Sequence, residues 1–270
     1  MAGACAAMIG VFVGGLAQPA SAQTENAEVS IVHGIPGTPV DVYVDGERTL
    51  DNLEPETVAG PLSLPAGDYD VKIVAADAPN ADAPPVLEPQ TVAVESGQNV
   101  SLVAHLIPDG RPALTPFVND TGGVAAGDAR LVVRHTAAAP PVDVRADGEA
   151  IVSDLANPDE ATTDVPAGTV SADVVLAGES DPVIGPTDLD LRQGTATIVY
   201  AVGSAEDDSL GVVTQTLTNL GSTPDSVPGG IGTQQTQEWL PVAIGLGMAG
   251  LVLVALSLLT RSRAAAGSRR

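Results

Sequence analysis

The chain has 270 residues, enough for one or two domains with hydrophobic cores, and its 34 acidic against 11 basic residues give a formal net charge of −23. Such an acidic surface repels phosphate backbones, which excludes nucleic acid as a favoured partner and leaves cations or basic surfaces. The acidity is equally consistent with the solubility of an exported domain and with adaptation to salty surroundings.

Residues 1–22 have the pattern of a secretory signal peptide. An apolar run over residues 4–17 is followed by the small residues Ala20 and Ala22, which form a small-x-small cleavage site directly before Gln23. No Lys or Arg precedes the run, so either the start codon lies upstream or the amino terminus supplies the only positive charge. We expect cleavage between Ala22 and Gln23.

The single cysteine, Cys5, lies within the predicted signal peptide. After cleavage the chain would begin with a short segment, residues 23–28, and would have no thiol. The sequence therefore predicts no disulfide, no Cys-ligated zinc site and no cysteine nucleophile.

Residues 29–118 are predicted to form a first module of short strands. Aromatic residues make up only 2% of the chain, so its cores depend on Val, Leu and Ile, which favour strands. Residues 40–44 alternate Val with Asp or Tyr, which predicts a strand with Val on one face. Asp45-Gly46 then predicts a hairpin turn. Further strands are expected at residues 69–75, 90–94, 100–106 and 114–118.

A second module, residues 129–217, repeats the first after a linker at residues 119–128. Matched blocks occur in the same order at a nearly constant offset, which indicates a tandem duplication. The matched pairs are residues 29–33 with 131–135, 39–47 with 141–149, 64–67 with 165–168 and 99–106 with 196–203. Short strands at regular spacing without helical periodicity predict two tandem Ig-like antiparallel β-sandwiches.

The C-terminal part predicts a stalk and a membrane anchor. Residues 218–238 are rich in Gly, Ser, Thr, Gln and Pro, as in a flexible stalk. Residues 239–260 contain an uncharged apolar run, long enough as a helix to cross the roughly 30 Å hydrocarbon layer. Trp239 begins the segment, where an aromatic ring favours the headgroup region.

A basic tail, residues 261–270, follows the predicted helix and includes Arg261 and Arg263. By the positive-inside rule this tail is cytoplasmic, which places the modules outside the cell. An Arg-rich tail after an apolar run is also typical of a cell-wall sorting signal, but no Leu-Pro-x-Thr-Gly motif precedes this one. We expect a single-pass protein of the cell membrane.

One set of motifs resembles a known family. Val32-His33-x-x-Pro36, the run Pro-Val-Asp-Val-Tyr-Val-Asp-Gly at residues 39–46, and Leu-Pro-Ala-Gly-x-Tyr at residues 64–69 resemble the domain of unknown function 4397 of exported bacterial and archaeal proteins. The resemblance covers about residues 27–118 and, more weakly, 129–217. It implies an Ig-like β-fold at the cell surface, without a known activity or catalytic residues to transfer.

Few residues suggest chemistry. His33 and His135 occupy equivalent strand ends, which favours a framework role, and His105 falls within a strand. Asp41 with Asp45, and Asp143 with Asp147, lie about 13 Å apart along a strand, too far for the roughly 5–9.5 Å of a glycosidase pair. A turn and a solvated face explain these pairs best.

The acidic stretches 77–82 and 206–208 leave weak calcium binding open, although neither is an EF-hand loop. We expect no other cofactor and no enzyme activity. The sequence favours an envelope display, spacer or adhesion module, with an envelope protein or a glycan as partner. The alternative is a module that binds calcium or a basic partner through its acidic loops.

Overall fold

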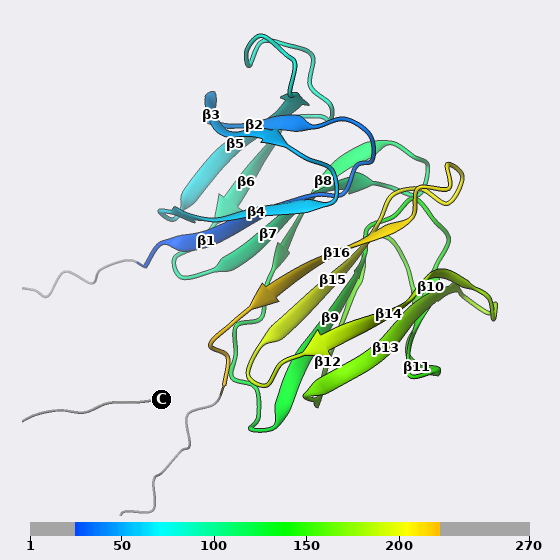
Figure 1. The fold of residues 1–270 in the computed structure, drawn as a ribbon. Coiled ribbons are helices and arrows are strands. Elements are labelled where there is room, and N and C mark those ends of the chain that lie inside the picture. The colour runs from blue at the N-terminus through cyan, green and yellow to red at the C-terminus, as the bar shows by residue number, and fades with distance from the viewer. Residues whose placement is uncertain (1–24, 222–270) are drawn as a thin grey trace, which may run out of the picture. The chain divides into compact units, whose positions relative to one another are not determined.

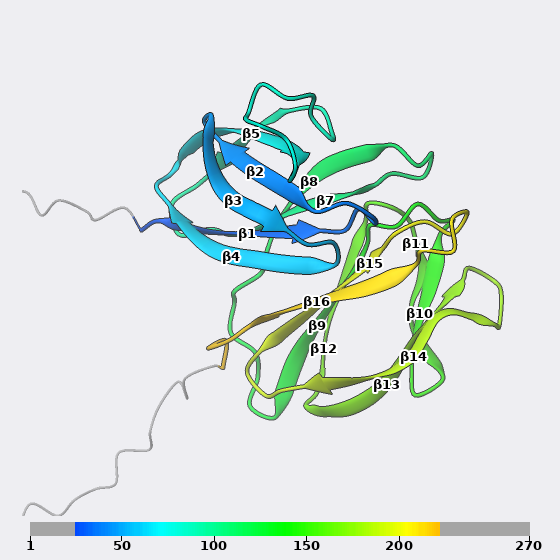
Figure 2. The same cartoon turned by 45° about the horizontal axis from the view of Figure 1, so that its top comes forward.

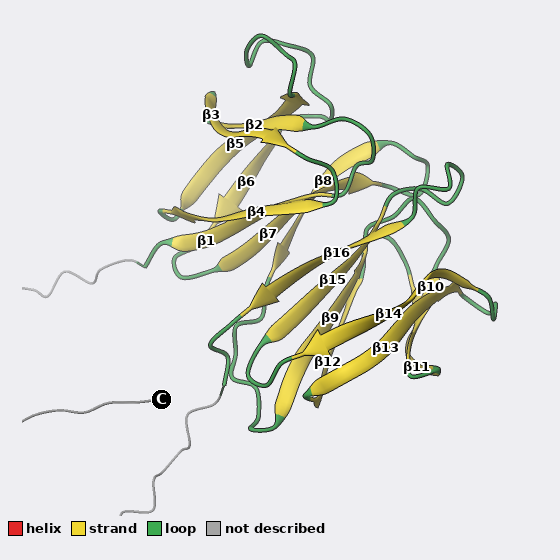
Figure 3. Cartoon of the chain, in the orientation of Figure 1, coloured by secondary structure: helices red, strands yellow, loops and turns green. Residues whose placement is uncertain are grey.

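In a computed structural model of the chain, residues 25–221 are described, and they form sixteen β-strands without a helix (Figures 1 and 3). The all-β prediction is confirmed for this part of the chain. None of its elements is a helix that would cross a bilayer. The predicted signal peptide, most of the stalk, the membrane helix and the basic tail lie outside the described residues.

Module 1 contains two four-stranded sheets, with strand orders β4-β1-β7-β8 and β3-β2-β5-β6. Its strands are β1 (Ala27–His33), β2 (Val40–Val44), β3 (Glu47–Leu53), β4 (Thr57–Leu64), β5 (Gly67–Ala75), β6 (Gln90–Val94), β7 (Asn99–Leu106) and β8 (Pro112–Val118).

Module 2 repeats this arrangement, with strand orders β12-β9-β15-β16 and β11-β10-β13-β14. Each strand takes the place of the strand eight positions earlier, which agrees with the duplication inferred from the sequence. Its strands are β9 (Asp128–His135), β10 (Val142–Ala146), β11 (Glu149–Leu155), β12 (Glu160–Pro166), β13 (Gly168–Leu176), β14 (Pro182–Leu191), β15 (Ala196–Val202) and β16 (Gly211–Leu217).

The predicted antiparallel pairing is wrong for one strand pair in each module. β1 pairs with β7 in parallel, and β9 pairs with β15 in parallel. Tight turns join antiparallel neighbours, whereas the chain between β1 and β7 passes through the other sheet and returns to run in the same direction. The sheets that contain these pairs are therefore mixed.

The predicted hairpin turns are confirmed in both modules. Asp45 and Gly46 have φ values of 51° and 80°, and Asp147 and Gly148 have 51° and 84°. Positive φ at two successive residues is the requirement of a type I′ turn, whose twist matches that of the flanking strands. The turns connect β2 to β3 and β10 to β11.

Each module is a sandwich with an apolar core between its sheets. In module 1 the core includes Val29 and Leu102 from one sheet and Val42 and Ile73 from the other. The core of module 2 is built in the same way by residues such as Leu131 on β9 and Val174 on β13. Burying these aliphatic side chains provides the main stabilisation of a chain that has few aromatic residues.

A third apolar cluster joins the two modules. It includes Val32 and Val103 from module 1 and Ile198 and Val202 from module 2. The sheet β4-β1-β7-β8 thus has its second face against the sheet β12-β9-β15-β16, and β16 runs beside β4 (Figures 1 and 2). As a result, β15 is buried along its whole length.

The connecting segments also pack against module 2. Val124, in the predicted linker, and Leu220, in the predicted stalk, are buried in a small cluster with Ala196. The backbone N–H of Val124 donates to the carbonyl of Leu220 at 2.6 Å. The first stalk residues are therefore part of the folded unit.

Candidate functional site

The site residues predicted for export and anchoring lie outside the described residues. They are Ala20, Ala22 and Gln23 at the signal cleavage site and Trp239, Arg261 and Arg263 at the membrane anchor.

His33 and His135 occupy equivalent positions at the ends of β1 and β9, and both are buried. Nε2 of His33 donates to the carbonyl of Thr38 at 3.1 Å, and Nε2 of His135 donates to that of Pro140 at 3.0 Å. Each ring thus holds the loop that leads to the next strand. Desolvation lowers the pKa of both histidines below 6.5, although these hydrogen bonds act in the opposite direction.

His105 lies on β7 and is fully buried. Its Nε2 is 2.8 Å from the hydroxyl of Thr115, and its Nδ1 is 3.2 Å from the carbonyl of Leu106. Burial lowers the pKa of this imidazole, and the nearby His135 of module 2 adds to the effect. Each of the three buried histidines therefore holds a loop or a neighbouring strand within its own module.

The carboxylates of the paired aspartates accept hydrogen bonds from backbone N–H groups. Asp41 was expected on a solvated face, but it is fully buried. Its carboxylate is compensated there, because Oδ1 accepts the N–H of Asn52 at 2.9 Å and Oδ2 pairs with Arg48 at 3.1 Å. Asp45 accepts the N–H of Asp70 at 2.9 Å. These carboxylates replace missing ladder bonds beside the hairpin.

The second copy uses its aspartates in the same way. Asp143 accepts the N–H of Asp154 at 2.9 Å, and Asp147 accepts the N–H of Ser171 at 3.0 Å. Within residues 25–221, no three His, Cys, Asp or Glu side chains are grouped so as to hold a metal ion.

Arg134 is the centre of a polar cluster at the junction of the modules, although its side chain is only 1% exposed. Its Nε donates to Glu160 at 2.8 Å, its Nη1 to the hydroxyl of Tyr200 at 2.9 Å, and its Nη2 to Oδ1 of Asn119 at 2.8 Å. The guanidinium also lies 4.4 Å from the ring centroid of Phe117 in module 1. Every nitrogen of this buried cation thus has a partner, as burial of a charge requires.

The cluster extends across the junction to module 1. Ser101 on β7 donates to Oε1 of Gln215 on β16 at 2.9 Å, and Tyr200 donates to the same oxygen at 2.6 Å. Asn119 in turn donates to Ser101 at 2.9 Å. Fully connected polar networks of this kind fix one relative arrangement of the groups that they join.

A second contact joins the modules at the other end of β7. Nδ2 of Asn157 in module 2 donates to the carbonyl of Leu106 in module 1 at 2.8 Å and to that of Ala137 at 2.6 Å. Neither contact was predicted from the sequence. The available signal was Arg134 itself, a charged residue in an apolar strand where the first copy has Val32.

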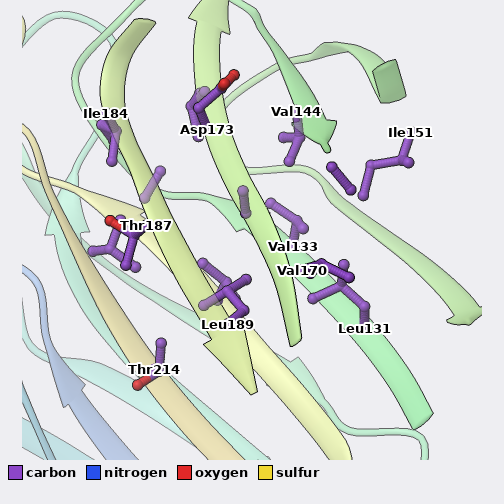
Figure 4. A pocket seen from close by; sticks show the side chains of 16 residues that line it. Leu131, Val133, Val144, Ile151, Val170, Asp173, Ile184, Thr187, Leu189 and Thr214 are labelled. Atoms are coloured by element: carbon purple, nitrogen blue, oxygen red, sulfur yellow. The ribbon is translucent and has the colours of Figure 1, made fainter. Parts of the chain in front are cut away.

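Module 2 also contains a cavity of about 310 Å³ between its two sheets (Figure 4). Residues of all the strands of module 2 except β12 line it, and most of their side chains are aliphatic. Asp173 is the only charged residue of the lining, and its Oδ1 accepts a hydrogen bond from Nε of Arg145 at 2.6 Å. The remaining polar lining residues are Thr187 on β14 and Thr214 on β16.

Comparison with protein families gives one match. Residues 27–145 match the family model "Domain of unknown function (DUF4397)", a segment that covers module 1 together with β9 and nearly all of β10. A search of curated proteins found no match. The resemblance identified from the strand and turn motifs is confirmed for this segment, and the match does not extend over the rest of module 2. The family model thus covers residues 27–145, which are fewer than half of the 270 residues of the chain.

Proposed function

We propose that this protein is a non-catalytic component of the cell envelope, a rigid spacer or display module that presents its surface to an envelope protein or a glycan. In this proposal two Ig-like sandwiches stand outside the cell. The C-terminal helix at residues 239–260 anchors them in the membrane, and the basic tail remains in the cytoplasm.

The observation that carries the proposal is the buried junction around Arg134. Two modules joined only by a linker would change their relative orientation freely, and their reach from a membrane would vary. Here an apolar cluster and a satisfied polar network lie between the modules, so they are expected to behave as one body. A body of fixed dimensions suits a spacer or a display support.

Cysteine labelling of intact cells tests the topology. With Cys5 replaced by Ser, a single cysteine is introduced either at Ser153, which is exposed on β11, or at Ser262 in the predicted tail. A membrane-impermeant maleimide is expected to label Ser153→Cys in intact cells and Ser262→Cys only after the membrane is opened. Labelling of Ser153→Cys only after lysis would contradict an extracellular location.

Binding of the purified chain to envelope extracts and glycan arrays tests the presenting role. Retention of a defined envelope protein or glycan is the expected result. Catalytic turnover of a small molecule by the same preparation would contradict the non-catalytic assignment.

A further inference from the structure

The cavity in module 2 has the size of a ligand site. Its volume of about 310 Å³ lies at the lower end of the roughly 300–1,000 Å³ that is typical of small-molecule pockets. An apolar cavity of roughly 150 Å³ accommodates benzene, so a cavity of about 310 Å³ accommodates roughly a dozen non-hydrogen atoms.

The cavity is a property of module 2 and does not follow from the fold alone. Because the two modules share strand order and register, each lining position has a counterpart in module 1. Leu131 and Leu189 are larger than their counterparts Val29 and Val92, but at six other positions module 2 has the smaller side chain. The pairs are Val44 and Ala146, Tyr69 and Val170, Val71 and Ala172, Ile73 and Val174, Leu102 and Val199, and Leu114 and Val212.

The largest reduction is at Val170 on β13. Its counterpart Tyr69 packs against the core of module 1, and its hydroxyl donates to the carbonyl of Pro65 at 2.8 Å. Module 2 keeps the proline, as Pro166, but replaces the ring by an isopropyl group. Interiors are normally packed to high density, and removing side-chain atoms without compensation destabilises a core. The core of module 2 therefore lacks side-chain volume that is present in the core of module 1.

The lining selects an uncharged aliphatic ligand. It contains no aromatic ring on which a planar ligand would stack and no basic residue that would pair with an anionic headgroup. Its one carboxylate, on Asp173, is already paired with Arg145. The hydroxyls of Thr187 and Thr214 offer hydrogen bonds to a single polar group on a chain otherwise surrounded by Leu, Val and Ile (Figure 4).

We propose that the inter-sheet cavity of module 2 binds the aliphatic chain of an uncharged lipid-like molecule, such as a medium-chain alcohol or ester. The binding free energy comes from transfer of the chain out of water into the space between β13, β14 and the sheet that contains β9. The proposal does not depend on the spacer role, because the cavity lies within module 2, on the face of the β12-β9-β15-β16 sheet opposite the junction around Arg134.

Thermal unfolding of the purified full-length chain with 1-decanol tests the site. At a free concentration about 100-fold above Kd, a ligand that binds only the folded state is expected to raise Tm by roughly 5–10 °C. Decanoate, which has a similar chain but an anionic headgroup, is expected to give a much smaller rise. An equal rise with decanoate would overturn the assignment of an uncharged ligand.

A filled-cavity variant provides the decisive comparison. The triple substitution Ala146→Val, Val170→Tyr and Ala172→Val introduces the module 1 residues, and the new hydroxyl can donate to the carbonyl of Pro166. It should bind 1-decanol at least tenfold more weakly, whereas the control Val118→Ala, at an exposed position of module 1, should bind like the unsubstituted chain. All three proteins are measured in the same detergent solution, so loss of the alcohol to detergent does not differ between them.

If the triple variant fails to fold, Ala172→Val alone is used, with the same expected direction and a smaller effect. A response to 1-decanol that is identical in the filled and unsubstituted chains, or absent from both, would overturn the proposal.

Discussion

Arg134 shows how one side chain connects the two modules. Replacement by Ala removes the donor from Asn119 and Tyr200, while Glu160, which is 39% exposed, regains water. Removing one partner from a buried charged cluster costs about 3–5 kcal/mol. Because Glu160 is rehydrated, we expect Arg134→Ala to lower the free energy of unfolding by about 3 kcal/mol, measured by urea denaturation.

The matched control is Arg111, whose pair with Asp109 is exposed on both sides. Exposed pairs contribute little, so Arg111→Ala should change the stability by less than about 0.5 kcal/mol. Equal effects of the two substitutions would show that the junction depends on apolar packing alone.

The three buried histidines predict a pH dependence. Burial lowers the pKa of His33, His105 and His135 below their unfolded value of 6.5, so the unfolded chain binds more protons than the folded chain just below that pH. Stability is therefore expected to fall as the pH decreases from 7 to 5, by at most about 1.4 kcal/mol per pH unit for each histidine. Denaturation at a series of pH values measures the slope, and His105→Gln should make it shallower. A slope that is unchanged in this variant would argue against a contribution from His105.

At the scale of elements, the sequence predicts a strand or turn correctly where the residues of that element specify it without a distant partner. Asp45-Gly46 requires no distant partner to form a type I′ turn, and its position was predicted correctly. The strands β3, β4, β11 and β12 were missed. All four are edge strands, where polar residues and Pro are tolerated, so Pro61 within β4 concealed a real strand.

Gly203, directly after β15, is predicted to be indispensable for the β15–β16 connection. Its φ is +87°, and an added Cβ would overlap the carbonyl oxygen of Ser209. Gly203→Ala should therefore combine backbone strain with a clash and cost roughly 2–5 kcal/mol in urea denaturation. Gly37 has a φ of +106° but open space around it, so Gly37→Ala should cost only about 1–2 kcal/mol. Similar costs at both positions would mean that the loop after β15 moves to relieve the clash.

At the scale of the molecule, the sequence indicated two modules but did not indicate how closely they associate. Val103 and Ile198 lie on strands that are buried on both faces, and the sequence does not distinguish a second face that meets its own module from one that meets the other module. The cavity was equally invisible, because each replacement, such as Val71 by Ala172, conserves apolar character. Only the sum over paired positions reveals the lost volume.

The strong negative charge predicts stabilisation by salt. The chain has 34 acidic but only 11 basic residues, so repulsion among the acidic groups opposes folding. Added ions screen this repulsion. We expect NaCl to raise Tm, and CaCl₂ at equal ionic strength to raise it by the same amount. A clearly larger rise with calcium would indicate a specific site and favour the calcium-binding alternative.

The shared apolar cluster makes cooperative unfolding the strongest test of the arrangement of the modules. Two independent sandwiches would unfold at separate denaturant midpoints, whereas modules with a common buried face lose stability together. Hydrogen exchange, measured at increasing denaturant concentration, is expected to give the same unfolding midpoint for the amides of β5 in module 1 and of β13 in module 2. Ile198→Ala, a cavity-creating change at the junction, should lower the free energy of unfolding by about 2–5 kcal/mol and so lower both midpoints at once. Because Ile198 belongs to module 2, a loss confined to β13 would mean that the sheets touch without stabilising each other.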